Sequence, residues 1–510
     1  MRLNIVIGGR AGQGINLVSK IVSSVLTQQG YFTFNYRDYP SIIRGGHNFN
    51  VLSISDEKIE SHESTIDGIV AMDDLTMEVH KKELKKSGFI IKPDSFLEFG
   101  INLNVALAAA LMKILGIKKD VLNDEIKQSI KKNVEDALKA SDAGYASETT
   151  KIQLPAPHPN KIRIISGSEA IAEGAANSHI DAYIAYPMTP STAVLQILAS
   201  QQEKLGHIVF QPEGEIAVVN SALAVSFAGA RTMIGTSGGG FALMNEGISL
   251  QGQSEVPLVV YLVSRPGPAT GVPTYTSQGD LNLALRAGHG EFPRVVIAPG
   301  TPKEAIEKTN EAFYLSEQHG VLSIILSDKH LAESEFSLVE PINKPTKIQI
   351  KRKVPGETII KATSYEHDDI GNTTEDADIA YKNGLKRLKK YEEIKKSCQK
   401  FEMIKIHGKK DSKNLIIGWG STAGAIKDAI KDLDAKFLQV LYIKPLSSEI
   451  KKHIEESSNV LLIENNLTGQ LGRLIREKTG ISVKKRILKF DARPFHSDIL
   501  KQQIIKELIS

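Results

Sequence analysis

The chain has 510 residues, of which 41% are hydrophobic and 24% charged, an ordinary composition for a soluble globular protein. At roughly 150 residues per domain, this length predicts about three domains. Lys and Arg number 63 against 59 Asp and Glu, so the net charge of +4 argues against a protein that binds nucleic acid or a membrane surface.

Cysteine usage and hydropathy narrow the class further. Cys398 is the only cysteine, which excludes an internal disulfide and an iron–sulfur cluster ligated by this chain alone, since such a cluster takes about four thiolates. A single thiol fits a reducing cytoplasm, and we expect Cys398 to be a helix residue without a chemical role. No apolar stretch approaches the ~20 residues of a membrane span, and the sequence after Met1 predicts a strand rather than a signal peptide.

The first domain is predicted over residues 1–150. It opens with a strand over 3–7, the loop Gly8-Gly-Arg-Ala-Gly-Gln-Gly14 and a helix over 15–28. Apolar runs at 51–54, 68–71 and 88–91 and a buried helix over 105–115 follow, and this alternation predicts an α/β unit with a largely parallel sheet. The glycine loop lacks both G-x-G-x-x-G spacing and a Walker lysine, so a phosphate-binding turn and a purely structural turn are equally compatible with it.

The second domain, residues 162–335, follows a proline-rich spacer centred on residues 154–160. Helices and strands alternate along it, which is typical of a doubly wound sheet. The predicted helices are 168–177, 191–206, 215–228, 241–251, 279–287 and 302–318, and the predicted strands are 182–185, 232–235, 258–262, 294–297 and 321–326.

Two segments complete the predicted organisation. Residues 336–411 are polar and are predicted to form a connecting arm with a charged amphipathic helix, which carries Leu385, Leu388 and Tyr391 at one-turn spacing. The third domain, residues 412–510, again opens with a strand, a loop and a helix, and the predicted strands are 415–419, 436–440 and 460–463. The fold class is therefore α/β, with three α/β domains.

The loop from Arg265 to Thr274 is the most informative segment. It places one permanently charged guanidinium among Gly, Pro and Thr residues, directly after an apolar run at 256–263 that predicts a buried strand. Open α/β sheets bind ligands at the carboxyl ends of their strands, and a guanidinium fork suits a planar carboxylate. The segment therefore predicts a site for a small carboxylate-bearing substrate.

Thr189 lies between two prolines in Tyr186-Pro-Met-Thr-Pro190, again just after a predicted strand. Prolines restrict the backbone on both sides, so the hydroxyl is suited to donate to a carbonyl oxygen that becomes negative during a reaction. Capping of the helix that follows is an equally open role for this residue.

Glu215 stands at the start of a predicted helix whose first turns are apolar on all sides. Burial there would disfavour the charged carboxylate and suit an acid that exchanges a proton with a ring nitrogen. The alternative is a carboxylate that complements the helix dipole, worth ~0.3–1 kcal/mol. The nearby turn Gly235-Thr-Ser-Gly-Gly-Gly240 either lets a ring lie against the backbone or eases packing.

In this order, the motifs resemble the α subunits of 2-oxoacid:ferredoxin oxidoreductases, in the form in which a γ domain precedes the α part. The resemblance covers nearly the whole chain. Besides the segments already quoted, it rests on Tyr39-Pro-Ser-Ile-Ile-Arg44-Gly-Gly-His47, Gln211-Pro-Glu-Gly-Glu215, His289-Gly-Glu-Phe-Pro-Arg294, Gly418-Trp-Gly420, Glu464 to Gln470 and Asp491-Ala-Arg-Pro-Phe495. It implies a γ-type domain, a pyrimidine-binding domain for thiamine diphosphate and a transketolase C-terminal-like domain.

The resemblance implies thiamine diphosphate chemistry. Glu215 would contact N1′ of the aminopyrimidine and favour its imino tautomer, which deprotonates the thiazolium C2, and Gly238 and Gly239 would adjoin the cofactor. The carbon nucleophile so formed would attack the 2-oxo carbon, and CO2 would leave.

The family's substrate residues also have counterparts here. Thr189 would hydrogen-bond the 2-oxo oxygen, and Arg265 would hold the substrate carboxylate. Thr274 and Arg44 would support substrate binding.

Partners follow from the resemblance as well. The chain has no G-D-G…N segment for Mg²⁺ and the diphosphate, so thiamine diphosphate would be shared with a β subunit that carries Mg²⁺ and a [4Fe–4S] cluster. Coenzyme A would accept the acyl group and ferredoxin the electrons. The assembly would be cytoplasmic and contain one or two αβ units, and this chain alone would be inactive.

The substrate is open at this point. The order of the domains, γ before α, resembles that in enzymes that act on 2-oxoglutarate, or broadly on 2-oxoacids including branched ones. It is less similar to that in enzymes specific for pyruvate. Two interpretations from other classes stand beside it: a nucleotide-binding regulatory protein built on the glycine loop, and a structural partner that docks ferredoxin without touching substrate.

Overall fold

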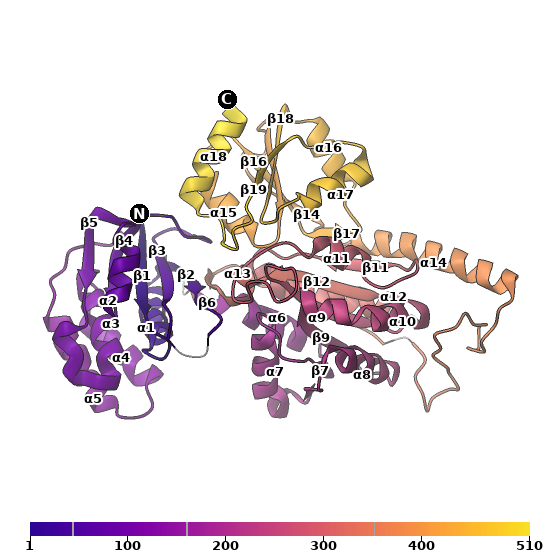
Figure 1. The fold of residues 1–510 in the computed structure, drawn as a ribbon, viewed down its shortest axis with the longest axis horizontal. Helices are drawn as coiled ribbons and strands as arrows, with labels where there is room; N and C mark the ends of the chain where they lie inside the picture. Colours follow the sequence, from indigo (N-terminus) through magenta and orange to yellow (C-terminus); the bar gives the residue numbers. More distant parts are fainter. Residues whose placement is uncertain (43–44, 160–161, 351, 510) are drawn as a thin grey trace. The chain divides into compact units, whose positions relative to one another are not determined.

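The computed structural model describes residues 1–42, 45–159, 162–350 and 352–509, which form two compact units. The first unit comprises Met1–Ser166, Glu333–Glu340 and Phe495–Gln502, and the second comprises Gly167–Ala332, Pro341–Pro494 and Gln503–Ser510. Figure 1 shows the elements of each unit, coloured along the chain. Both units combine open sheets with helices, which confirms the predicted α/β class.

The first unit is built on a mixed sheet with the strand order β5-β4-β1-β3-β2-β13-β6. Only the β1/β4 and β4/β5 neighbours run parallel, whereas β1/β3, β2/β3, β2/β13 and β13/β6 are antiparallel. The strands are β1 (Arg2–Gly9), β2 (Phe32–Asp38), β3 (Asn48–Ser55), β4 (Ile66–Ala71), β5 (Leu84–Ile91), β6 (Arg163–Ser166) and β13 (Glu335–Leu338).

The prediction of a largely parallel sheet in this unit is therefore wrong. The segment between β2 and β3 is too short for a crossover helix, so β3 returns alongside β2 in the opposite direction. The prediction also lacked β2, β6 and β13, and β13 comes from a segment that the sequence placed at the boundary of the connecting arm.

Helices of the first unit follow the prediction more closely. Helix α1 (Ile15–Gln28) has the predicted bounds, and α3 (Leu103–Ile114) is the predicted buried helix. A Cβ on Gly144 would overlap the carbonyl oxygen of Ala106, so this glycine permits the close approach of α3 and α5. The remaining helices are α2 (Asp74–His80), η1 (Asp94–Asn102), α4 (Lys119–Ser129) and α5 (Val134–Ala146).

One segment of the first unit, Asp94–Ile114, is long and apolar enough to cross a membrane by length and composition alone. It is interrupted at Gly100, whose φ of 52° and ψ of −113° are not helical. Its second half, α3, lies in the hydrophobic core, packed among residues of α1 and the sheet. Core helices of this kind pass the same test, so the segment is accounted for as a core helix.

The second unit contains a sheet with the strand order β17-β11-β12-β10-β9-β7-β8. All neighbours in it run parallel except β11 and β17, as the predicted alternation requires. The strands are β7 (Ala182–Ile184), β8 (Ile208–Phe210), β9 (Thr232–Ser237), β10 (Leu258–Ser264), β11 (Arg294–Ile297), β12 (Leu322–Asp328) and β17 (Tyr442–Lys444).

Helices of this sheet lie close to their predicted bounds, but the helix predicted over 241–251 is split at Met244 into α9 and α10. The helices are α6 (Gly167–Asn177), α7 (Thr192–Leu205), α8 (Glu215–Phe227), α9 (Gly238–Leu243), α10 (Asn245–Ser254), α11 (Leu281–Arg286) and α12 (Pro302–His319). Two further helices, α13 (Lys329–Glu333) and α18 (Ser497–Ile509), contribute residues to both units.

A third sheet, with the order β14-β16-β15-β18-β19, belongs to the second unit as well. Its predicted strands are confirmed, and the structure adds β14, antiparallel to β16, and β19, parallel to β18. The elements are β14 (Ile404–Gly408), β15 (Asn414–Trp419), β16 (Lys436–Val440), β18 (Asn459–Glu464), β19 (Lys485–Leu488), α15 (Thr422–Ala429), α16 (Glu449–Glu455) and α17 (Gln470–Thr479).

The predicted charged helix is α14 (Ala377–Cys398). Leu385 and Leu388 are exposed on it, whereas Ile394 and Cys398 are buried at its carboxyl-terminal end. Burial and the nearby Glu311 raise the pKa of the Cys398 thiol to about 12, so the thiol stays protonated at neutral pH. This agrees with the expectation that Cys398 has no chemical role.

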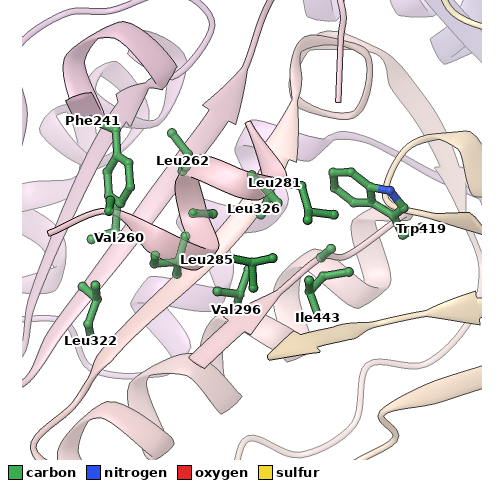
Figure 2. Close-up of a cluster of buried hydrophobic side chains, with 14 of the residues drawn as sticks. Phe241, Val260, Leu262, Leu281, Leu285, Val296, Leu322, Leu326, Trp419 and Ile443 are labelled. Carbon is green, nitrogen blue, oxygen red and sulfur yellow. The ribbon is translucent and has the colours of Figure 1, made fainter. Parts of the chain in front are cut away.

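One hydrophobic cluster joins the two sheets of the second unit. Val260, Leu326 and Ile443 of the seven-stranded sheet and Phe241 of α9 share it with Trp419 of β15 in the third sheet (Figure 2). Because apolar burial is the main stabilising term in folding, this shared cluster makes the two sheets one packed body.

Glu464, at the end of β18, is a buried polar anchor beside this cluster. Its carboxylate accepts hydrogen bonds from Trp419 Nε1 at 3.1 Å, Asn466 Nδ2 at 2.7 Å, and the amides of Leu471 and Gly472 at 3.0 and 3.2 Å. The two amides belong to the first turn of α17, where a carboxylate also complements the helix dipole. Burial raises the pKa of Glu464, and these donors oppose the rise.

We expect Glu464→Ala to lower the free energy of unfolding by at least ~3 kcal/mol, because it leaves several buried donors without an acceptor. Urea unfolding followed through the fluorescence of Trp419, the sole tryptophan, would measure the loss. Glu393→Ala, at an exposed position of α14, is the matched control and should shift the curve by less than ~0.5 kcal/mol. Equal shifts for the two variants would contradict the assigned role.

Candidate active site

The predicted motifs meet at one edge of the parallel sheet in the second unit. Strands β10, β9 and β7 are neighbours and run parallel, so their carboxyl ends lie side by side. The Arg265 loop follows β10, the turn at Gly238 follows β9, and the segment with Thr189 follows β7. Ligands of open α/β sheets bind at such an edge, so the arrangement is that of a binding site.

Arg265 ties two of these segments together. Its Nη1 donates a hydrogen bond to the carbonyl oxygen of Thr189 at 2.8 Å, across the end of β9. The side chain is half-buried, and burial lowers the pKa of the guanidinium while the nearby Asp280 opposes that change. One face of the guanidinium is thus fixed by the protein, which orients the remaining donors for an anion.

Thr189 is placed as predicted, but its observed contact is made by the backbone. Helix α7 begins at Thr192 with Ser191 as its N-cap, so Thr189 is not the residue that caps this helix. The side chain of Thr189 is half-buried, and the guanidinium of Arg265 contacts the backbone carbonyl of this residue. Of the two roles left open by the sequence, capping is therefore excluded.

Glu215 begins α8 and is 7% exposed. Its Oε1 is buried and has no hydrogen-bond partner within the described part of the chain. A Cβ on Gly240 would lie 2.7 Å from this oxygen and would overlap Thr236 Oγ1. An unpaired buried carboxyl oxygen is costly, which makes Glu215 a candidate for a ligand-binding residue.

Two hydroxyls at the same edge share this property. Thr274 is 5% exposed, and neither its Oγ1 nor that of Ser237 has a partner in the described ranges. Gly239 is exposed, and the nearest atom to a Cβ placed on it is the carbonyl oxygen of Ala269 at 3.9 Å. The close approach at this turn is therefore made at Gly238 and Gly240 rather than at Gly239.

Asp280 is a member of this group that the sequence did not single out. Its carboxylate is buried next to Gly238, where a Cβ would lie 2.5 Å from Oδ2, and that oxygen has no hydrogen-bond partner among the described residues. Burial raises the pKa of Asp280, and Ser264 and Arg265 oppose the rise. The carboxylate is the counter-charge of Arg265, and it explains why position 238 has no side chain.

The loop that carries Thr274 and Asp280 is held from the third sheet through Gln278. Its backbone N–H donates to the carbonyl oxygen of Asn465 at 2.7 Å, and its Oε1 accepts from the Asn465 amide at 2.9 Å. Its Nε2 donates to the carbonyl oxygen of Trp419 at 2.7 Å. The segment from Glu464 to Gln470, which is part of the family resemblance, therefore contributes by holding the loop at Gln278.

Arg44 lies outside the described residues. The glycine loop lies between β1 and α1 in the first unit, where Gly12 and Gly14 have φ values of 95° and 88° and Gln13 Oε1 accepts from the Arg10 amide at 2.6 Å. These conformations account for glycine at both positions.

Family profiles match both units of the chain. A profile described as "Pyruvate flavodoxin/ferredoxin oxidoreductase, thiamine diP-bdg" matches residues 173–403, and one described as "Pyruvate ferredoxin/flavodoxin oxidoreductase" matches residues 4–98. The chain is thus an oxidoreductase subunit with a thiamine diphosphate-binding domain.

Similar proteins of known name narrow the class of oxidoreductase. A 2-oxoacid:ferredoxin oxidoreductase subunit alpha from Sulfolobus sp. is 28% identical over 99% of this chain and 97% of its own length. The 2-oxoglutarate synthase subunit KorA of Archaeoglobus fulgidus is 39% identical over 34% of this chain and 51% of its own length. A solved 2-oxoglutarate:ferredoxin oxidoreductase from Magnetococcus marinus has the same fold, with a TM-score of 0.91, 24% identity and 99% of both chains covered. The chain belongs to the family of 2-oxoacid:ferredoxin oxidoreductase α subunits.

Two adjacent glycines of α9 test the described packing. We expect Gly240→Ala to lower the unfolding midpoint, because its Cβ would meet Glu215 and Thr236, with a loss of ~1–3 kcal/mol. Gly239→Ala has open space and should be neutral or stabilising by up to ~1 kcal/mol, since alanine favours helix. Thermal unfolding of both variants would measure this, and a stable Gly240→Ala would contradict the tight contact.

Proposed function

We propose that the chain binds the 2-oxoacid and the pyrimidine end of thiamine diphosphate in an enzyme that oxidatively decarboxylates 2-oxoacids with coenzyme A. Electrons would pass to ferredoxin through a partner β subunit. The observation that carries the proposal is the pairing at one sheet edge of an oriented guanidinium, Arg265, with a buried and unpartnered carboxyl oxygen on Glu215. A carboxylate substrate and a ring nitrogen are the partners that these two groups lack.

Each residue then has a defined task. Thiamine diphosphate, when bound, supplies a carbon nucleophile that adds to the 2-oxo carbon and takes up the electron pair left by CO2. Glu215 holds the proton at the pyrimidine N1′, which its burial and its free oxygen suit. Gly238 and Gly239 form the turn that the ring would adjoin, and Gly240 extends it.

Substrate groups are bound by the loops after β7 and β10. Arg265 holds the carboxylate with donors that the Thr189 carbonyl orients. The Thr189 hydroxyl would donate to the 2-oxo oxygen, where negative charge develops, and the buried hydroxyl of Thr274 would complete the hydrogen bonds to the substrate. Arg44 is proposed as a further substrate residue on the sequence pattern alone.

The β subunit would supply the diphosphate site with Mg²⁺ and the [4Fe–4S] cluster. The chain's single cysteine, Cys398, is buried and cannot ligate a cluster alone. An apolar surface near Glu215 supports docking of a partner there: Ile216 and Leu243 are 58% and 56% exposed, and α8 packs against α9. An assembly of one or two αβ units in the cytoplasm is proposed on the same resemblance.

We propose 2-oxoglutarate as the preferred substrate, since relatives named 2-oxoglutarate synthase subunit KorA include one that is 39% identical over 177 residues. A broad 2-oxoacid range is the second candidate, because relatives covering 99% of the chain are named 2-oxoacid:ferredoxin oxidoreductase. The proposed domains are the γ domain (1–150), the pyrimidine-binding domain (162–335), the arm (336–411) and the transketolase C-terminal-like domain (412–510).

Dye reduction by the native complex, isolated through a tag on this chain, tests the function. Coenzyme A would be supplied with 2-oxoglutarate, pyruvate, a branched 2-oxoacid or an aryl 2-oxoacid in turn. Coenzyme A-dependent reduction is expected, with 2-oxoglutarate preferred. A complex without an iron-containing partner would instead favour the nucleotide-binding regulatory protein.

We expect Glu215→Gln to abolish turnover and leave the complex assembled, because the amide keeps the shape but cannot exchange the proton. Turnover by dye reduction and assembly by size-exclusion chromatography would be measured on the same sample. A variant that kept most of the activity would remove Glu215 from catalysis and favour a subunit that only docks ferredoxin.

We expect Arg265→Lys to raise KM for the 2-oxoacid about tenfold or more, because lysine keeps the charge and loses the two-pronged fork. Steady-state kinetics of the complex would separate this from an effect on kcat. Arg473→Lys, at an exposed position of α17, is the matched control and should leave KM unchanged. An unchanged KM for Arg265→Lys would show that this residue does not bind the substrate carboxylate.

A further inference from the structure

A cavity in the second unit lies apart from the candidate active-site edge. Its volume is about 570 Å³, within the range of small-molecule sites, and it shares no lining residue with the candidate active site. Its walls come from α11, α14, α16, α17, β17 and the segment that follows β17. The proposed function leaves this cavity without a role.

Cations dominate its lining. Five basic side chains and one carboxylate face it: Arg286, Lys395, Lys444, Lys451 and Lys478, with Glu477. Glu477 Oε2 accepts from Arg286 Nη2 at 2.8 Å, and its Oε1 lies 3.0 Å from Lys478 Nζ, so one negative charge serves two positive ones. The cavity therefore keeps an excess of positive charge.

The acidic partners of the two lysines at the edge of the cavity reduce this positive excess only slightly. Lys395 lies 3.8 Å from Glu392 and Lys451 lies 3.7 Å from Glu455, each on its own helix and about half exposed. Exposed pairs at such distances contribute little and are screened by salt. Both lysines remain free to turn toward an anion in the cavity.

Lys444 is the central group. It is half-buried and makes no ion pair within the ranges that the structure describes. Burial, with the nearby cations Arg294, Lys478 and Arg286, lowers the pKa of Lys444 to about 8, and Glu477 opposes the change. A cation held in this way is unfavourable unless an anion joins it, which is characteristic of binding sites.

Apolar side chains form the rest of the wall. The lining includes Leu285, Ile443, Leu446, Leu474 and the ring of Tyr391. A bare inorganic anion would leave this surface in contact with water. A ligand that combines phosphates with a flat apolar ring would use both parts of the wall.

We propose that this cavity is a binding site for a nucleoside polyphosphate, with the phosphates on Lys444, Arg286 and Lys478 and the base against the wall that contains Tyr391. The edge lysines would contribute to the binding of the outer phosphates. The proposal does not depend on the reaction catalysed at the sheet edge.

Titration of the full chain with a fluorescent ATP analogue carrying a methylanthraniloyl group tests the proposal. We expect Lys444→Gln to weaken binding about tenfold or more, since a charge-assisted contact to phosphate is lost. Lys389→Gln, on α14 near the cavity but 80% exposed and outside the lining, is the control and should leave the affinity unchanged. Absence of binding at millimolar concentration, or equal effects of the two variants, would overturn the proposal.

Three further measurements separate the site from general surface charge. Affinity of the unmodified chain should fall as pH rises from 7 to 9, because Lys444 loses its proton near pH 8, and Lys444→Gln should lack this dependence. Without ligand at pH 7, Lys444→Gln should unfold at the same temperature or higher, because it removes an unfavourable buried charge. Inorganic triphosphate should bind more weakly than ATP, and equal affinities would overturn the assignment of a base to the apolar wall.

Discussion

The exchange of hydrogen bonds around Gln278 is the constraint on which the active-site edge depends. The side-chain amide and the backbone N–H of this residue bind the Asn465 backbone and the Trp419 carbonyl, all in a region without access to water. Hydrogen bonds in such surroundings are strong when complete and costly when broken. Because Thr274 and Asp280 are only four and two residues away, the third sheet sets where these side chains lie.

The glycine-rich turn at the start of α9 is constrained by its neighbours as well. Gly238 and Gly240 each face a buried carboxylate, Asp280 in one case and Glu215 in the other. The two carboxylates differ in their surroundings, because Asp280 lies next to the guanidinium of Arg265 while Glu215 has an oxygen with no protein partner. Asp280 therefore lies against a positive charge, whereas Glu215 has an oxygen that is free to accept a hydrogen bond from a ligand.

The prediction of the second unit from the sequence rested on the pattern of hydrophobic residues. Apolar strands such as β10 and β12 are buried on both faces, so they read as continuous hydrophobic runs, and their helices end near glycine or begin at clear caps such as Thr301. The first unit was harder, because β2, β6 and β13 are short or polar, and β13 pairs with β2 residues about 300 positions away and with β6 residues about 170 positions away. Local sequence holds no signal for such a pairing.

The same limit applies to the site. Glu215, Arg265 and Thr189 could be proposed from the sequence because each follows a strand or opens a helix in a recognisable pattern. Asp280 and Gly240 were missed because their importance arises from neighbours across the sheet edge, which spacing along the chain does not reveal. Leu385 and Leu388 have the spacing of an apolar helix face, yet both are exposed. Helical spacing alone does not tell which face of a helix a neighbour covers.

The position of β13 also determines when the first sheet can be completed. This strand lies between β2 and β6 and pairs with both, yet it is encoded about 170 residues after β6. During synthesis on the ribosome, the edges of β2 and β6 therefore stay open until most of the second unit's parallel sheet has emerged. Open edges are prone to wrong pairing, so assembly of the amino-terminal unit is timed by the translation of a segment far downstream.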